Sequence, residues 1–153
     1  MATRWLTPEE RQAWLALTGM LTKLPTALDA GMAKHAGLTY FEYMVLAMLA
    51  EESGGTLRMS TLAERTHGSL SRLSHVVRRL EKQGLVQRVG ALEDRRATNA
   101  ILSPEGRQRV EMAAPAHVAY VRDIVIDGIS EDDLRTVIRV GEGILERLDG
   151  APS

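Results

Sequence analysis

The segment from Ser69 to Gln83 predicts an α-helix with two contrasting faces, and it constrains what the rest of the chain can form. Its apolar residues recur at i, i+3, i+4 and i+7, a spacing that gathers side chains on one side of a helix: Leu73, Val76, Val77 and Leu80. Gly84 follows where a glycine commonly ends a helix. The other side carries hydroxyl, imidazole and cationic groups: Ser71, Arg72, Ser74, His75, Arg78, Arg79 and Lys82. We therefore expect one face to pack on a core and the other to meet a polar partner.

The segments on either side of this helix extend the pattern. Residues 59–65 are typical of a short helix, and Thr66-His67-Gly68 is typical of a tight turn. Two helices joined by a short glycine-containing turn form a helix-turn-helix. Downstream, residues 85–89 and 97–102 alternate apolar and polar side chains as strands do, around the polar segment 90–96. This second pattern predicts a β-hairpin with a charged tip, which is a wing.

Three consecutive motifs carry a resemblance to a known family. They are Leu80-Glu81-Lys82-Gln83-Gly84-Leu85-Val86-Gln87-Arg88, then Asp94-Arg95-Arg96, then Leu102-Ser103-Pro104-Glu105-Gly106. In this order the chain resembles the MarR family of winged-helix transcriptional regulators over nearly its whole length. Many members carry Asp-Pro-x before the Asp-Arg-Arg of the wing, whereas Gly90-Ala91-Leu92-Glu93 stands there in this chain. The resemblance implies a third strand at residues 56–58, beside the wing.

The predicted fold is mainly α (α+β): a winged helix-turn-helix over residues 37–102, with N- and C-terminal dimerisation helices in 1–36 and 103–153. Thr7-Pro8-Glu9-Glu10 begins the first helix with a capping residue, a proline at the first helical position and a glutamate three residues after the cap. Pro25 lacks an amide hydrogen, so we expect it to kink or interrupt that helix. The flanking helices are too apolar to be satisfied by a compact winged helix alone, which predicts a homodimer.

Charge distribution favours a nucleic-acid partner despite a formal net charge of −1. Residues 58–96 contain nine Arg and Lys against four Asp and Glu, a local balance of +5. Charges further away than about 8–10 Å are largely screened, so the local balance decides binding to a polyanion. We expect double-stranded DNA as the partner, and a two-fold dimer would then require a pseudo-palindromic operator.

Other functional classes find little support in the sequence. There is no cysteine, and His35, His67, His75 and His117 lack the spacing of metal ligands, so no metal or cofactor is expected. No nucleophile motif or phosphate-binding glycine loop is present, which argues against an enzyme. No apolar run is long enough for a membrane span and no signal-peptide pattern opens the chain, so a cytoplasmic protein is expected.

The predicted DNA-binding residues fall into three groups. Base edges in the major groove are assigned to Ser71, Arg72, Ser74, His75 and Arg78. Phosphates or local ion pairs are assigned to Arg79, Lys82 and Arg88. In the wing, Arg95 is assigned to the minor groove, where A·T-rich stretches concentrate negative potential. Asp94 is negatively charged and cannot contact DNA favourably. We therefore expect it to hold Arg96 or Arg88 through a charge-assisted hydrogen bond.

The family resemblance also implies a small, often aromatic, effector that binds between the dimerisation helices and the winged helix. Soft and aromatic side chains suit such a ligand, and the candidates are Trp14, Met20, His35, Tyr40, Tyr43 and Met44. The alternative is that these residues only form core and dimer contacts. The resulting hypothesis is a homodimeric repressor released by its effector. The alternative function is a winged-helix module that binds a protein or ligand and leaves its DNA face unused.

Overall fold

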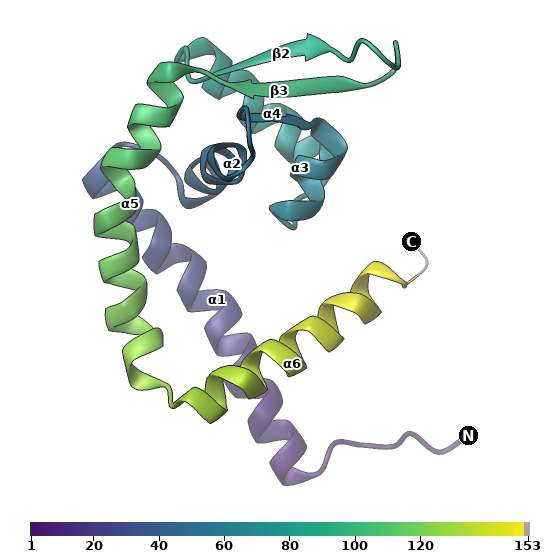
Figure 1. Cartoon of the computed structure of the whole chain (residues 1–153). Helices are drawn as coiled ribbons and strands as arrows, with labels where there is room; N and C mark the ends of the chain where they lie inside the picture. The colour runs from purple at the N-terminus through teal and green to yellow at the C-terminus, as the bar shows by residue number, and fades with distance from the viewer. Residues whose placement is uncertain (152–153) are drawn as a thin grey trace. The chain divides into compact units, whose positions relative to one another are not determined.

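The computed structural model describes residues 1–151 and divides the chain into two compact units, one from Met1 to Ala114 and one from Pro115 onward. The described helices and strands follow in chain order (Figure 1): α1 (Pro8–Ala36), α2 (Tyr40–Glu51), β1 (Thr56–Arg58), α3 (Met59–Arg65), α4 (Leu70–Lys82), β2 (Val86–Gly90), β3 (Thr98–Leu102), α5 (Pro104–Ile124), the 3-10 turn η1 (Ile126–Gly128) and α6 (Glu131–Asp149). This is a small sheet among helices, so the predicted mainly α winged helix-turn-helix fold is confirmed.

Helix starts lie where the sequence predicts them, because capping side chains replace the missing backbone partners. Thr7 and Glu10 form a reciprocal capping box at α1, and Thr39 and Glu42 form another at α2. The expected interruption at Pro25 is wrong, since α1 runs without a break from Pro8 to Ala36. The helix surface around this proline is exposed, so water can hydrate the carbonyl that loses its donor.

The sheet is antiparallel with the order β1-β3-β2, which confirms both the wing and the third strand beside it. Leu57 and Arg88 both lie opposite Ala100, and Val86 lies opposite Leu102. Because facing residues share one side of a sheet, this register puts Arg88 on the same side as the buried Val86 and Ala100. Arg88 therefore faces the helices instead of the solvent side of the wing.

The core of the first unit forms around α2, which is seen end-on in Figure 1 and contacts α3, α4 and β3. The predicted stripe of α4 is buried in this core: Leu73, Val76, Val77 and Leu80. At the base of the wing, where β3 ends, the Ser103 hydroxyl donates to the Gly84 carbonyl at 2.6 Å and accepts from the amide of Gly106 at 3.0 Å. A Cβ at Gly106 would lie 2.2 Å from the Leu85 carbonyl oxygen, so only glycine permits this packing.

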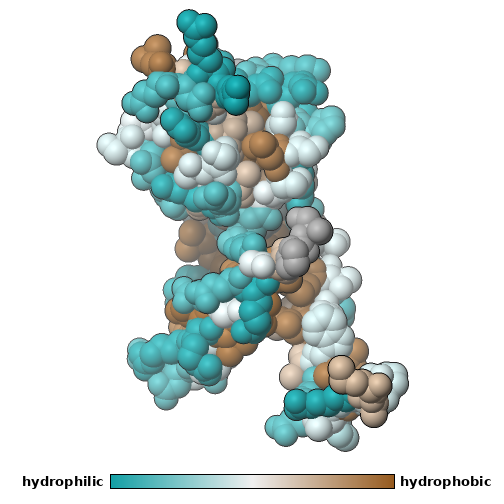
Figure 2. Space-filling view, turned by 90° about the vertical axis from the view of Figure 1, so that its right-hand side faces the viewer, coloured by the Kyte–Doolittle hydropathy of each residue, from teal (hydrophilic) through white to brown (hydrophobic). Residues whose placement is uncertain are grey.

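The second unit contains the end of α5, η1 and α6. α5 continues through Pro115, while the turn η1 was not predicted from the sequence. No residue of α6 is buried. Two of its large apolar side chains, Leu134 and Ile144, are half-buried, and five are exposed: Val137, Ile138, Val140, Leu145 and Leu148. In Figure 2 the visible face of the winged-helix part is mainly hydrophilic. Within residues 1–151, none of the helices combines the length and apolarity needed to cross a membrane.

Candidate nucleic-acid interface

Helix α4 presents the predicted polar residues together on one exposed face. The hydroxyl of Ser69 caps the helix by accepting from the amide of Arg72 at 3.1 Å. Beyond the cap, Ser71, Arg72, His75, Arg78, Arg79 and Lys82 are exposed and Ser74 is half-buried. Because the opposite stripe is fixed in the core, this face has a defined orientation, as a helix that enters a DNA groove requires.

The turn between α3 and α4 depends on a close approach to Phe41. A Cβ at Gly68 would lie 2.7 Å from Cζ of the Phe41 ring, so the glycine is needed for space. The left-handed residue of the turn is His67, with φ of 51°, and not the glycine. His is one of the residue types that tolerate this conformation more often. Gly68 thus lets α3 and α4 close over the start of α2.

Phe41 also supports Arg72, a contact that sequence reasoning missed. The Arg72 guanidinium lies 4.1 Å above the centroid of the Phe41 ring. A stacked guanidinium is attracted by the ring face, while its N–H groups stay in its own plane and remain free to donate. Arg72 therefore has a restricted position at the start of α4 and keeps its hydrogen-bonding edges for a partner.

Arg79 makes an ion pair within the protein. Its Nη2 lies 3.3 Å from Oε1 of Glu42, a carboxylate that is only 7% exposed. The second oxygen of Glu42 accepts from the amide of Thr39 at 3.0 Å, so one carboxylate both caps α2 and holds α4. Of the two roles predicted for Arg79, phosphate contact or local ion pair, the structure shows the ion pair.

Arg88 is likewise held by an acidic residue, Glu81 in the last turn of α4. Oε1 of Glu81 accepts from the backbone amide of Arg88 at 3.0 Å, and Oε2 accepts from its Nε and lies 2.9 Å from its Nη2. Burial raises the pKa of the Glu81 carboxyl, but the hydrogen bonds from Arg88 and the charges of Arg88 and Arg78 lower it more, so the pKa is below its ordinary value. This contact joins the end of α4 to the first strand of the wing.

At the tip of the wing, Asp94 binds Arg96, one of the two partners predicted for it, through the backbone amide of that residue. Asp94 does not hold Arg88, whose guanidinium is bound to Glu81, and its carboxylate accepts from the backbone amide of Arg96 at 2.9 Å. This is a local turn bond of the kind that aspartate commonly makes. The exposed Glu93 lies 3.7 Å from Arg58 of β1. Arg95 is exposed and makes no ion pair with any described residue. Its positive charge is therefore accessible to an external partner.

A hollow of about 400 Å³ separates the start of α4 from the wing. Ser74 and Leu70 line it from α4, and the sheet and the wing add three cationic groups and one carboxylate: Arg58, Arg88, Arg96 and Asp94. In Figure 1 β2 and β3 project past the helices of the same unit. The exposed face of α4 and the projecting wing therefore lie on either side of a cleft lined by three arginines and one aspartate, an arrangement suited to a duplex with alternating grooves.

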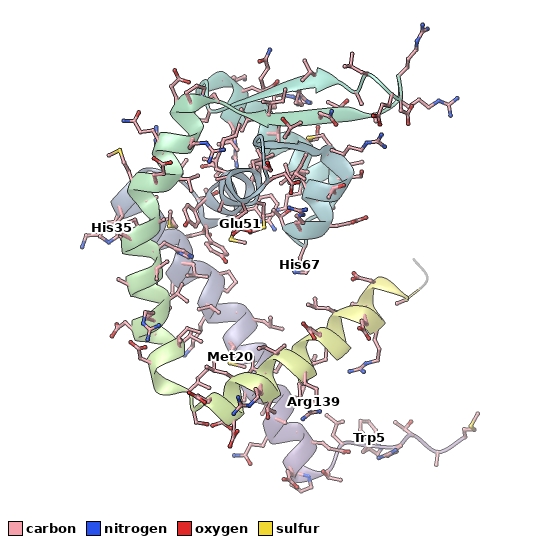
Figure 3. The ribbon with its side chains drawn as sticks, viewed as in Figure 1. Trp5, Met20, His35, Glu51, His67 and Arg139 are labelled. Atoms are coloured by element: carbon pink, nitrogen blue, oxygen red, sulfur yellow. The ribbon has the colours of Figure 1, made fainter. Side chains whose placement is uncertain are left out.

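The six effector candidates are not gathered at one place. Trp14, Met20 and His35 are exposed on α1, and Figure 3 shows Met20 near its middle and His35 near its end. These two are 15 residues apart, or about 22 Å along a helix. Tyr40 and Met44 are half-buried on α2 and Tyr43 is buried. Burial raises the pKa of both the Tyr40 and Tyr43 phenols, and the proximity of Tyr40 and Glu51 raises that of Tyr43 further.

Among the residues that the structure describes, no three His, Asp or Glu side chains lie close enough together to hold a metal ion. Sequence reasoning missed four residues that shape the site: Phe41, Glu42, Leu70 and Glu81. Glu81 belongs to the motif that carries the family resemblance, but its partner follows only from strand register. Leu70 could have been identified from the sequence, because it is an apolar residue at the first position of a basic helix.

Fold and site together define a winged helix-turn-helix protein of the transcription-regulator class. A sequence model described as MarR family matches residues 36–97. The crystal structure of Sco3205, a MarR family transcriptional regulator from Streptomyces coelicolor, in complex with DNA, is 36% identical, with a TM-score of 0.92 over 99% of this chain and 94% of that one. AbsC, a MarR family transcriptional regulator from the same organism, is 38% identical, with a TM-score of 0.90 over 97% and 100% of the two chains.

A relative with a similar sequence over a shorter length is also described as a transcriptional regulator. The HTH-type transcriptional regulator YfiV of Bacillus subtilis (strain 168) is 31% identical over 103 residues, which are 67% of this chain and 62% of YfiV. The chain thus spans somewhat less than two thirds of that relative. These findings confirm the resemblance seen in the sequence: the chain belongs to the MarR family. Because its relatives are transcriptional regulators, the prediction that it is not an enzyme is confirmed as well.

Proposed function

We propose that this protein is a homodimeric, sequence-specific DNA-binding regulator that represses transcription. The observation that carries the proposal is the exposed basic face of α4 beside a wing whose Arg95 is unpaired by any described carboxylate. Sco3205, which is similar over nearly the whole chain, was crystallised in complex with DNA. The proposed location is the cytoplasm, where regulators of its bacterial relatives' kind meet chromosomal DNA.

In this proposal α4 enters the major groove. Ser71, Arg72, Ser74, His75 and Arg78 reach base edges there, and Arg95 enters the adjoining minor groove. Lys82, exposed near the end of α4, contacts phosphates. Arg79 and Arg88 make ion pairs within the protein, with Glu42 and Glu81, and in this proposal they fix the helix and the wing in place.

The proposed dimer rests on apolar surface that this single chain leaves uncovered. Large side chains exposed on α1 include Trp14, Leu15, Met20 and Leu21, and α6 carries the five already named. Burying one such side chain completely is worth about 1.5–3 kcal/mol, so a second copy that covers several of them would be held firmly. Residues 1–36 and 103–153 are the proposed dimerisation region. Two α4 helices would then face half-sites about 34 Å apart on a pseudo-palindromic operator.

We also propose release by a small aromatic effector, for which α2 offers the best-placed candidates. Tyr40, Tyr43 and Met44 lie within one and a half turns of one helix. The two tyrosines combine an apolar ring with a polar tip, and the methionine adds a soft thioether. Such a ligand would act by favouring a dimer geometry whose α4 spacing no longer matches the grooves.

Binding-site selection from random duplexes tests the function directly. We expect one enriched pseudo-palindrome, with affinity that falls steeply as salt rises because phosphate contacts release counterions. In fluorescence anisotropy, Arg72→Ala should lower affinity for the selected operator much more than for random DNA. Lys82→Ala should lower both alike. A chain that prefers no duplex at low ionic strength would instead be the alternative, a winged-helix module for protein or ligand binding.

A further inference from the structure

Leu70 is a largely exposed apolar side chain at the start of α4, the helix proposed to bind DNA, and it is not part of the hydrophobic core. It is the first residue of the helix, directly after the capping Ser69, and it is 56% exposed. The next residue of the apolar stripe, Leu73, is completely buried, whereas Leu70 lies outside the hydrophobic core. Because Leu70 lies at the start of the helix, beyond the residues that pack in the core, its side chain is accessible to a partner.

The surroundings of Leu70 indicate what kind of partner that is. It lines the hollow between α4 and the wing together with the half-buried Ser74, one helical turn further on. The charged side chains of the hollow come from the sheet and the wing, and arginines outnumber the single carboxylate: Arg58, Arg88, Arg96 and Asp94. An apolar protein segment would have to desolvate these guanidinium groups to reach Leu70. A duplex offers phosphates to the cations and base edges to the helix start at the same time, which makes DNA the complementary occupant.

The major groove presents one apolar group, the C5-methyl of thymine. In helix-turn-helix proteins the N-terminal residues of the second helix contact base edges, and Leu70 is the first residue of that helix. We propose that Leu70 packs against a thymine methyl and makes the protein select thymine at one position of each half-site. This inference rests on the proposed function, since it requires that α4 lies in the major groove.

Replacing thymine by deoxyuridine removes the methyl and keeps every hydrogen bond of the base pair. In the operator obtained by selection, each thymine is replaced in turn, symmetrically in both half-sites, and binding is measured by fluorescence anisotropy. For the wild-type protein we expect one position at which the replacement weakens binding by about fourfold per half-site, the equivalent of one buried methyl. Leu70→Ala should bind the thymine operator more weakly than wild type and be indifferent to uracil at that position.

Leu92→Ala is the matched control, because Leu92 in the wing loop is a leucine 106% exposed. It should keep the same sensitivity to uracil as the wild type, and both variants should keep the wild-type circular dichroism spectrum. A wild-type protein that is indifferent to every methyl, or a Leu70→Ala variant that remains as sensitive as wild type, would overturn the inference and leave DNA binding intact. Failure to bind any duplex would overturn the proposed function itself.

Discussion

Glu81 at the end of α4 binds Arg88 at the start of the wing through both of its carboxylate oxygens, one to the backbone amide at 3.0 Å and the other to Nε at 2.9 Å. Both side chains are about 30% exposed or less, so water screens the pair only in part. This residue pair therefore connects α4 to the wing, the two elements proposed to bind DNA.

Glu81→Gln should loosen the wing. The amide keeps the size of the side chain but loses the charge, and its NH₂ group cannot accept from Arg88. We expect a loss of about 1–2 kcal/mol in unfolding free energy, toward the lower end of the roughly 1.5–3 kcal/mol of a hydrogen bond to a charged group, because water partly screens the pair. Operator affinity should fall as well, because the wing is no longer fixed. Urea denaturation and anisotropy would measure the two effects.

The matched control for that variant is Glu93→Gln, at the other ion pair of the wing. Glu93 lies 3.7 Å from Arg58 and its side chain is 89% exposed, so this pair should contribute almost nothing to stability. Equal losses in the two variants would show that the Glu81 pair is no more than a surface contact.

Stability should depend on pH through the same carboxyl. The pKa of Glu81 in the folded chain lies below its ordinary value of 4.5, so the unfolded chain binds a proton more readily. The contribution of Glu81 is therefore fully present above the unfolded pKa and is lost as pH falls through the folded pKa. The difference in unfolding free energy between wild type and Glu81→Gln should shrink as pH is lowered from 7 toward 3. A difference that stays constant over this range would contradict the assignment.

Gly68→Ala should disturb the start of α4 through Phe41. The added Cβ would lie 2.7 Å from one ring atom and 3.1 Å from another, and the ring is buried beneath Arg72. We expect a loss of about 1–3 kcal/mol, typical of overpacking, measured by thermal or urea unfolding. Gly90→Ala in the wing is the control, because its Cβ would meet no atom within 4 Å and should change stability by less than about 0.5 kcal/mol. Similar losses at both positions would argue against a steric role for Gly68.

Local patterns predicted the elements of this fold, and contacts between elements account for what they missed. The stripe from Leu73 to Leu80 and the caps at Thr7 and Thr39 depend on neighbours three or four residues away, so the sequence shows them directly. The continuity of α1 through Pro25 goes against the local rule that proline interrupts a helix, and the exposure of this part of α1 follows only from the tertiary fold.

The contacts of the site could not be predicted from local sequence patterns either, because they join residues of different elements. Glu81 and Arg88 are seven residues apart across a helix end and a turn, and they meet only because strand register puts Arg88 on the helix side of the sheet. The sequence alone equally allowed Arg88 to pair with Asp94. Phe41 and Arg72 belong to different helices, so their contact required the packing of α2 against α4.

Ile138→Asp should convert the proposed homodimer into monomers. Ile138 is 57% exposed on the apolar stripe of α6, so the folded chain tolerates a carboxylate there, whereas a dimer interface would have to bury its charge. Analytical ultracentrifugation should show a shift from dimer to monomer at micromolar concentration, together with loss of operator binding and an unchanged circular dichroism spectrum. Arg139→Asp introduces the same carboxylate one residue away, off the stripe, and should remain dimeric. A dimer that survives Ile138→Asp would exclude this face of α6 from the interface.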